Sequence, residues 1–518
     1  PRPDLRYYAP HVHPTAILVE TDLCIYGGTA GGVVAAVEAA RNGLRVVVLE
    51  NSGHLGGLSA SGLGLTDFGN KAALGGLARE FYQRVGRHYG TAEEWHFEPH
   101  VAEAVFEAWV SEHEIPVFRR EYLRGVRQTG GVIEAIELES GLRVRARQYI
   151  DATYEGDLLA ATGVSFTVGR EGNAQYGETI NGMLIRPKHQ FNYAVDPYRT
   201  EGAPGSGLLP GIEAGHDFTP GRGDGRIQAY NFRMCLTNVA DNRLPFPRPA
   251  GYDRTEYELL ARYLRGGWNE VFAKFDPIRG HKTDTNNHGA VSTDFIGRNH
   301  RWPHAGYAER EGIFQAHVTY QQGLQWFLSH DPAVPAPIRE AYAQWGLARD
   351  EFTRTGGWPH ALYIREARRM VGDYVMTEND CRGLRRVEDP VALGAYGMDS
   401  HNCRRLLHDG RLWNEGDVQE AGFKPYAISF RSLVPRRGQC ANLTVAVCLS
   451  ASHIAYGSIR MEPVFMALGQ AAAVIAGQAL REKCAVQDVA YAGVRERLRQ
   501  AGQAIELAAG DAVPNEIV

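Results

Sequence analysis

The chain has few cysteines and no pattern that would pair them. Seven are spread through 518 residues, and no two form a C-x-x-C motif. An odd, scattered set excludes a disulfide-stapled scaffold and a zinc framework built on cysteine pairs. Unpaired thiols favour a reducing compartment, so we expect a cytoplasmic protein, with a removed signal peptide left open.

The chain also lacks long runs of one kind of residue. Its formal net charge is −5 and it has no long basic run, which argues against nucleic acid as the main partner. We see no apolar run near the roughly 20 residues that span a bilayer, so no membrane association is predicted. With 44% hydrophobic and 22% charged residues, the composition is that of a globular protein long enough for two or more domains.

What the chain does contain is a strand–turn–helix–strand pattern over residues 22–50. An apolar strand leads to Gly27-Gly28-Thr29-Ala30-Gly31-Gly32, and an alanine-rich helix and a second strand follow. This order suits a dinucleotide, because the turn lets backbone N–H groups approach a pyrophosphate at a helix N-terminus. Glu50 stands where a carboxylate bonds the adenosine ribose. We predict that these residues bind the cofactor; the alternative is an ordinary βαβ unit with a glycine-rich turn.

One position departs from the G-x-G-x-x-G pattern of dinucleotide-binding turns. Gly27 and Gly32 match the first and third glycines, whereas Thr29 occupies the second position, where the backbone comes closest to the phosphate. Either the Thr29 hydroxyl donates a hydrogen bond to the phosphate, or the loop lies slightly further from it.

The rest of the chain divides by composition. We predict an arm (1–20), a nucleotide-binding domain (21–170), an inserted substrate domain (171–400), the returning part of the nucleotide-binding domain (401–482), and a final helix and tail (483–518). Helices are predicted over 74–89 and 99–113, and a strand pair over 132–138 and 142–150. A buried strand over 442–448 precedes a helix that begins near Pro463, since proline suits the first helical turn.

A set of motifs extends along nearly the whole chain. It comprises Tyr26–Gly32, His54-Leu55-Gly56-Gly57, Asp151–Asp157, Gly357–His360, Tyr363–Arg369, Asp399-Ser400-His401, Phe430–Pro435, Ser450–His453 and Arg460–Pro463. As a set it resembles the FAD-dependent oxidoreductases of the glutathione-reductase-like superfamily, in the branch often labelled xanthan-lyase-like. The resemblance implies an α/β fold, with a discontinuous Rossmann-type FAD-binding domain and an inserted α+β substrate domain. We do not predict lyase activity from this label, because a dinucleotide site indicates redox chemistry.

The resemblance also implies further contacts to FAD. They are assigned to Gly56, Gly57, Ser59, Asp151, Asp157, His453, Arg460 and Pro463. The helix near Pro463 is expected to aim its N-terminus at the flavin and to stabilise negative charge on the reduced ring. We expect FAD to be held non-covalently; covalent attachment at His54 is the weaker alternative.

Oxidation by a flavin requires a hydride acceptor, flavin N5, and usually a base. Histidine suits the base because its pKa lies near the working pH. The candidates are His360, His401, His453 and His288, with the first two preferred. For each one the alternative is a structural histidine whose hydrogen bonds are satisfied within the fold.

The predicted substrate-binding residues are Asn287, Tyr363, Arg365 and Arg431. Asn287 belongs to a polar run that suits a hydroxylated ligand. Arg365 is predicted on a helix, where it either reaches a substrate carboxylate or joins ion pairs on the helix surface. Arg431 lies in an apolar segment and would need a partner if buried.

No metal site is expected. His11 and His13 are close in sequence, as are His300 and His304, but no cysteine or acid stands beside either pair at ligand spacing.

The sequence therefore predicts an FAD-dependent oxidoreductase that acts on a small polar substrate, sugar-like or a hydroxy acid. The mechanism would be hydride transfer to flavin N5 with a histidine base. The alternative is a redox-neutral flavoprotein, a lyase or isomerase. The expected partners are a small-molecule substrate and an electron acceptor, oxygen or another compound; a homo-oligomer is left open.

Overall fold

A parallel sheet forms the nucleotide-binding part of the computed structural model, which describes residues 5–507, 510 and 513–514. β1 (Ile17–Tyr26) pairs in parallel with β2 (Val46–Glu50) and with β6 (Leu142–Asp151). β3 (Val117–Arg119) extends the sheet beside β2, and β21 (Leu443–Val445) pairs with the last residues of β6. The carboxyl ends of these strands share one edge, as expected for the binding edge of a doubly wound sheet.

The first helices and the strand pair confirm local sequence predictions. α1 (Ala30–Arg41) follows the glycine turn, and α2 (Gly76–His88) and α3 (Pro99–Glu112) lie where helices were predicted. β4 (Leu123–Thr129), β5 (Val132–Leu138) and the first half of β6 form an antiparallel meander. β1 begins at Ile17, so the irregular arm is shorter than predicted.

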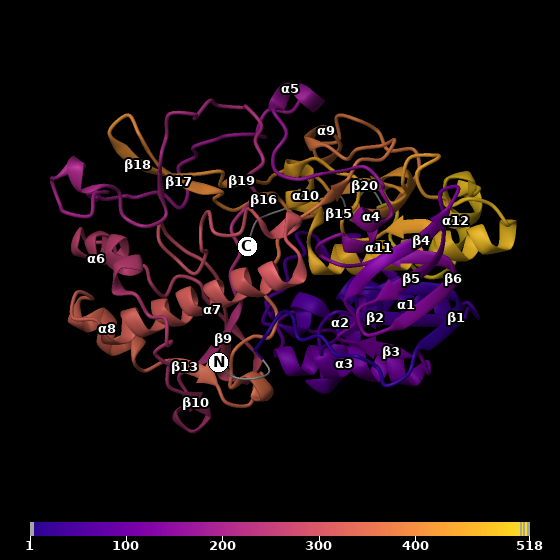
Figure 1. Cartoon of the computed structure of the whole chain (residues 1–518), viewed down its shortest axis with the longest axis horizontal. Coiled ribbons are helices and arrows are strands. Elements are labelled where there is room, and N and C mark those ends of the chain that lie inside the picture. The colour runs from indigo at the N-terminus through magenta and orange to yellow at the C-terminus, as the bar shows by residue number, and fades with distance from the viewer. Residues whose placement is uncertain (1–4, 508–509, 511–512, 515–518) are drawn as a thin grey trace.

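The end of the chain returns to this sheet, as the discontinuous fold requires. β21 is followed by α10 (His453–Ile459), α11 (Glu462–Glu482) and α12 (Tyr491–Gln500). In Figure 1 the yellow helix α11 lies beside α1 and α2, which belong to the first part of the chain. α11 packs closely on α1: a Cβ on Gly469 would lie 2.0 Å from the carbonyl oxygen of Gly31. Only glycine at this crossing allows the two backbones to approach so closely.

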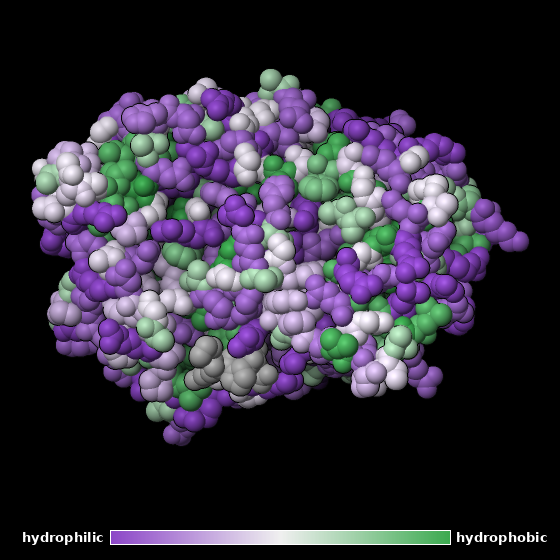
Figure 2. Space-filling model, in the orientation of Figure 1, coloured by the Kyte–Doolittle hydropathy of each residue, from purple (hydrophilic) through white to green (hydrophobic). Residues whose placement is uncertain are grey.

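The expectation that the chain has no long apolar run is wrong. α11 is long and apolar enough to cross a membrane by length and composition, with a mean hydropathy of 1.5 over its best window. However, 89% of that window is buried inside the protein. It is therefore a core helix of the nucleotide-binding part. Polar residues cover most of the molecular face in Figure 2, with apolar groups scattered among them.

A second, antiparallel sheet lies in the inserted part of the chain. Its strand order is β10-β13-β9-β12-β11, with bounds Met234–Thr237 (β9), Arg243–Leu244 (β10), Phe275–Ile278 (β11), Lys282–Thr285 (β12) and Gly346–Ala348 (β13). The long helix α7 (Tyr307–His330) packs on it through a shared apolar core. α6 (Glu258–Arg265) and α8 (Ala336–Tyr342) complete this side of the molecule (Figure 1).

Short strand pairs and helical turns connect the two parts. They are β7 (Phe166–Thr167) with β14 (Arg369–Met370), β15 (Pro390–Gly394) with β20 (Tyr426–Ser429), β16 (Met398–Ser400) with β19 (Val418–Glu420), and the short helices α4 (Asp157–Ala161), α5 (Asn173–Tyr176) and α9 (Glu378–Cys381). β17 (Arg404–His408) pairs with β18 (Arg411–Glu415) and β8 (Ile212–Ala214). β17 and β18 follow residue 401, where the nucleotide-binding domain was predicted to resume. They nevertheless form one sheet with β8, which belongs to the predicted substrate domain.

The helix predicted around Arg365–Arg369 is wrong. Residues 361–368 form no helix, and Arg369 begins β14. Within this segment Tyr363 forms an isolated antiparallel bridge with Asn231, next to the site described below.

Candidate functional site

The turn after β1 needs its first and third glycines for steric reasons. Gly27 has φ 107°, and a Cβ there would lie 2.7 Å from the carbonyl carbon of Ala152. A Cβ on Gly32 would lie 1.9 Å from the Gly27 carbonyl oxygen. Both positions therefore exclude a side chain, so the turn keeps the backbone exposed at the N-terminus of α1.

Thr29, at the second glycine position, caps α1. Its Oγ1 accepts a hydrogen bond from Gly32 N at 3.2 Å and donates one to the Ala152 carbonyl at 2.8 Å. The hydroxyl proton is thus directed at Ala152, which contradicts the first of the two alternatives, donation to a phosphate. The cap fixes the start of the helix instead.

Glu50 presents a buried carboxylate beside this turn. The residue is 6% exposed, and its oxygens accept hydrogen bonds from the backbone N–H groups of Gly28 and Ser52, both at 2.6 Å. Burial raises the pKa of this carboxyl. A carboxylate can accept about four hydrogen bonds, so capacity for two ribose hydroxyls remains.

A cavity extends from this carboxylate, and we name it the nucleotide cavity. Its lining combines the polar end formed by Gly27, Thr29, Glu50, Ser52 and Thr153 with the further residues His54, Gly57, Tyr154, His360, Leu362 and Ile364. The backbone N–H groups of the turn match the pyrophosphate of a dinucleotide, and the free acceptor capacity of Glu50 matches a ribose. These residues therefore fit FAD.

The second glycine loop packs against the first and reaches the N-terminus of α11. Gly56 N donates to the Gly28 carbonyl at 2.8 Å, and a Cβ on Gly57 would lie 2.2 Å from Tyr154 Oη. Tyr154 Oη donates at 2.7 Å to Glu462, the first residue of α11. Pro463 lies in the first turn of that helix, as predicted.

Glu462 is a buried acid at that helix N-terminus. It is 4% exposed, and Ser59 Oγ lies 3.3 Å from its second oxygen. Burial raises the pKa of Glu462 to about 7, although the hydrogen bonds from Tyr154 and Ser59 oppose this shift. The group is therefore poised between its neutral and ionised forms near neutral pH.

His360 and His54 lie together in the nucleotide cavity. Their rings stack with centroids 3.7 Å apart and planes 9° apart, and His54 Nδ1 lies 2.6 Å from Glu103. Burial, and then the neighbouring His54, lower the pKa of His360 well below its ordinary value. His360 thus lies on the cofactor side.

A second cavity, of about 230 Å³, lies beyond the segment 360–364, and we name it the polar cavity. Leu362 and Ile364 line the nucleotide cavity, whereas Tyr363 between them lines the polar cavity. The structure brings Asn287, His288, Tyr363 and His401, four of the predicted residues, to this cavity. The two cavities therefore share one wall.

His401 is held in the polar cavity by a buried carboxylate. Its Nδ1 lies 2.8 Å from Asp294, and Asp294 pairs with Arg365 at 2.9 Å. Burial would raise the pKa of Asp294, but Arg365 and His401 lower it to about 2. An ionised Asp294 accepts the Nδ1 proton of His401, which leaves Nε2 to the cavity side, 3.5 Å from Asp399.

Tyr363 is surrounded by three guanidinium groups. Arg365, Arg233 and Arg460 lie 4.7, 5.8 and 5.8 Å from its ring centroid. Arg460 donates to Tyr363 Oη at 2.9 Å and to Asp399 at 2.8 Å. Burial raises the pKa of Tyr363, so it enters the cavity as a neutral phenol.

Two of the predicted residues that line neither cavity are His453 and Arg431. His453 is 1% exposed and uses both ring nitrogens within the fold, on Glu366 at 2.7 Å and Ser400 at 2.9 Å. Arg431 is exposed and paired with Asp389 at 2.9 Å, so the burial under which it would need a flavin or substrate as partner is not present.

Two predicted acids and Arg365 have structural partners instead. Asp151 accepts hydrogen bonds from Thr153 N at 2.9 Å and from Leu159 N at 2.7 Å, and so fixes the cavity residue Thr153. Asp157 pairs with Arg310 and Arg368. The buried Arg365 binds Asp294 and the Ala229 carbonyl, and so holds the partner of His401 in place.

Sequence reasoning missed several residues of the two cavities. Tyr154 belongs to the motif Asp151–Asp157, and Asp399 is two residues from His401, so both could have been identified from the sequence. No sequence pattern points to Asp294, Arg233 or Asp67, because the residues that they contact are distant in sequence.

The sheet, the glycine turn and Glu50 define a Rossmann-type dinucleotide-binding protein. A sequence model of the family described as FAD dependent oxidoreductase matches residues 22–498. The chain therefore belongs to the FAD-dependent oxidoreductase family, and its cofactor is FAD. This confirms the resemblance of the motif set to FAD-dependent oxidoreductases.

Parts of several solved structures are similar to part of this chain. They include a mutant of a flavin monooxygenase from Stenotrophomonas maltophilia, with 19% identity over 30% of this chain and 42% of that chain and a TM-score of 0.21. A 3-ketosteroid-Δ4-(5α)-dehydrogenase from Rhodococcus jostii RHA1 has 15% identity over 30% of this chain and 51% of that chain, and a TM-score of 0.21. An L-amino acid deaminase from Proteus vulgaris has 14% identity over 32% of this chain and 55% of that chain, and a TM-score of 0.23. The match thus spans about half the length of these relatives, and no curated protein matches the chain significantly.

Proposed function

We propose that the protein oxidises a small polar, hydroxylated substrate held in the polar cavity, with His401 as the base. One observation carries the proposal. His401 lines that cavity while Asp294, itself fixed by Arg365, holds its Nδ1. A carboxylate on Nδ1 turns Nε2 toward the cavity, where Asp399 lies 3.5 Å away, and it stabilises the imidazolium formed after proton uptake.

The chemistry divides between the chain and its cofactor. His401 Nε2 takes the proton of the substrate hydroxyl while the C–H bond breaks and a carbonyl forms. When bound, FAD would supply the hydride acceptor, flavin N5, and the route by which the electrons reach oxygen or another acceptor. Nearby donors orient the substrate: Asn287 and the Tyr363 phenol line the cavity.

The charges of the polar cavity favour a substrate rich in hydroxyl groups. Besides three histidines, its lining contains three acids, Asp67, Asp276 and Asp399, and three cationic side chains, Lys188, Arg233 and Lys274. Arg233 is already neutralised by Asp284, with bonds of 2.7 and 2.6 Å. A balanced, hydrogen-bonding surface suits a sugar or a hydroxy acid better than a polyanion.

The seven cysteines are all free in the described part of the chain, and six are buried. This supports the cytoplasm as the proposed compartment, since free thiols persist in reducing surroundings.

The test compares flavin reduction in histidine variants. Aldoses, aldonic acids and 2-hydroxy acids are mixed anaerobically with the holoenzyme, and loss of the visible flavin absorbance is followed. His401→Gln should retain its FAD but lose about 100-fold or more of the reduction rate, since a positioned base contributes about 10²–10⁴. His216→Gln, an exposed histidine elsewhere, should match the wild type.

Two results would overturn the proposal. One is reduction of the His401→Gln flavin at the wild-type rate. The other is a comparable rate loss in His360→Gln with its FAD content intact, which would place the base in the nucleotide cavity.

A further inference from the structure

The N-terminal arm forms part of the wall of the nucleotide cavity. Arg6 and Tyr7 line this cavity, and Tyr7 Oη donates to Glu155 at 3.0 Å. The backbone N–H groups of Tyr7 and Tyr8 both donate to Glu311 on α7 at 2.8 Å. The arm therefore connects the inserted part to the nucleotide-binding part across the cofactor site.

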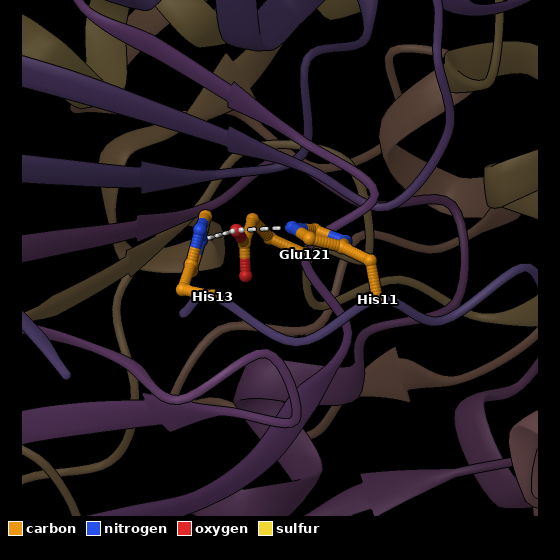
Figure 3. A group of neighbouring side chains, drawn as sticks. All are labelled: His11, His13 and Glu121. Atoms are coloured by element: carbon orange, nitrogen blue, oxygen red, sulfur yellow. Dashed lines mark hydrogen bonds and ion pairs between the residues drawn. The ribbon is translucent and has the colours of Figure 1, made fainter. Parts of the chain in front are cut away.

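Further along the arm, two histidines converge on one buried carboxylate. His13 Nε2 lies 2.9 Å and His11 Nε2 lies 3.6 Å from the same oxygen, Oε1 of Glu121. Figure 3 shows the two imidazoles pointing toward Glu121 from opposite sides. All three ligand atoms lie within 4.8 Å of one another. Motif spacing could not reveal this group, because Glu121 is 108 residues from His13.

Glu121 is held rigidly with one oxygen left for the histidines. Its side chain is 1% exposed, and Oε2 accepts the Ser140 hydroxyl at 2.5 Å. Its backbone N–H donates to the Glu50 carbonyl at 2.9 Å, so the carboxylate is anchored beside the residue expected to bind the ribose. Hydrogen bonding that fixes a ligand in this way is typical of metal sites.

The ligand set and its spacing match a divalent transition-metal ion. Ligand atoms about 2.0–2.1 Å from a tetrahedral zinc lie about 3.3 Å apart, and the distances of 2.9 and 3.6 Å lie on either side of this value. Two imidazoles and one carboxylate leave a fourth position for water. The side chains of His11 and His13 are 37% and 19% exposed, so an ion can enter from solvent.

A second cluster of similar composition shows what distinguishes this one. Glu98, His100 and Glu351 also gather their ligand atoms. There, Lys282 Nζ lies 2.7 Å from both glutamates and supplies the positive charge itself. In the described part of the chain, the ion-pair partners of Glu121 are the two histidines.

We propose that His11, His13 and Glu121 bind a divalent transition-metal ion such as Zn²⁺, which fastens the arm to the nucleotide-binding part and slows the release of FAD. The ion would join the arm to the residue that supports Glu50. Because Arg6 and Tyr7 lie shortly before the histidines in the chain, fixing the arm also fixes this wall of the cavity. Any effect of the ion on FAD affinity is matched by an equal effect of FAD on metal affinity.

The test measures Zn²⁺ binding to the untagged holoenzyme after EDTA treatment and dialysis. The wild type should bind one Zn²⁺ per chain. His11→Ala and His13→Ala should weaken binding about 100-fold or more, since each removes one of three protein ligands. His216→Ala, the matched control on an exposed histidine, should bind as the wild type does.

The second readout is the rate at which FAD leaves the diluted holoenzyme. Zn²⁺ should slow this release about tenfold in the wild type relative to EDTA, and not in His11→Ala. Binding of less than one equivalent, or equal affinity in His11→Ala, would overturn the metal site and leave a His13–Glu121 hydrogen bond. Stoichiometric Zn²⁺ with unchanged FAD release would overturn the fastening role.

Discussion

The buried carboxyl of Glu462 should make the stability of the flavin-free protein depend on pH. Burial raises its pKa from an ordinary 4.5 to about 7. Between these values the folded state binds more protons than the unfolded state, so stability falls as the pH rises. The stabilising contribution is fully present below pH 4.5 and is lost by the time the pH exceeds about 7.

The size of this loss follows from the shift. One pKa unit corresponds to about 1.4 kcal/mol, and integration between pH 5 and pH 8 gives a loss of about 2–3 kcal/mol. Because the residue is 4% exposed, solvent screening does not remove this contribution. Glu462→Gln keeps the shape of the side chain and cannot ionise.

The assay is denaturant unfolding of the flavin-free protein, followed by tryptophan fluorescence at both pH values. Glu462→Gln should resemble the wild type at pH 5 and be more stable by about 2–3 kcal/mol at pH 8. Glu20→Gln, whose side chain is 65% exposed, is the control and should show no such difference. A Glu462→Gln variant that gains nothing on moving from pH 5 to pH 8 would refute the reasoning.

Four further substitutions test other parts of the site. Glu50→Ala should weaken FAD binding about tenfold or more, as measured by FAD titration, because each hydrogen bond to a charged group contributes about 1.5–3 kcal/mol. Gly31→Ala should destabilise the protein by about 1–3 kcal/mol in denaturant unfolding, because its Cβ would lie 2.6 Å from the Phe465 carbonyl oxygen. Asp294→Asn should slow flavin reduction about 100-fold and change its pH profile, because His401 loses its tautomer control. Arg431→Ala should leave both FAD content and flavin reduction unchanged; a loss of either would return this surface arginine to the site.

Local features of the nucleotide-binding part could be predicted from the sequence. The steric need for Gly27 and Gly32 arises within one turn and the strand beside it, so the spacing of glycines is sufficient evidence. The helices α2 and α3 are likewise visible as periodic apolar patterns. Glu50 was found because its place at the end of β2 follows from that same local order.

Features set by distant contacts could not be predicted. Arg365 and Arg369 have helical spacing, but their buried guanidinium groups bind Asp294 and Glu171. These tertiary ion pairs outweigh helix propensity, which is weak per residue. His401 could be singled out, yet its partner Asp294 is 107 residues away in sequence.

The most direct test of the account is anaerobic titration of the wild-type holoenzyme with the panel of hydroxylated compounds. The account predicts that at least one compound bleaches the visible flavin absorbance and is recovered as its carbonyl product, one per flavin. A compound that the enzyme converts while the flavin stays oxidised, giving a redox-neutral product, would contradict it.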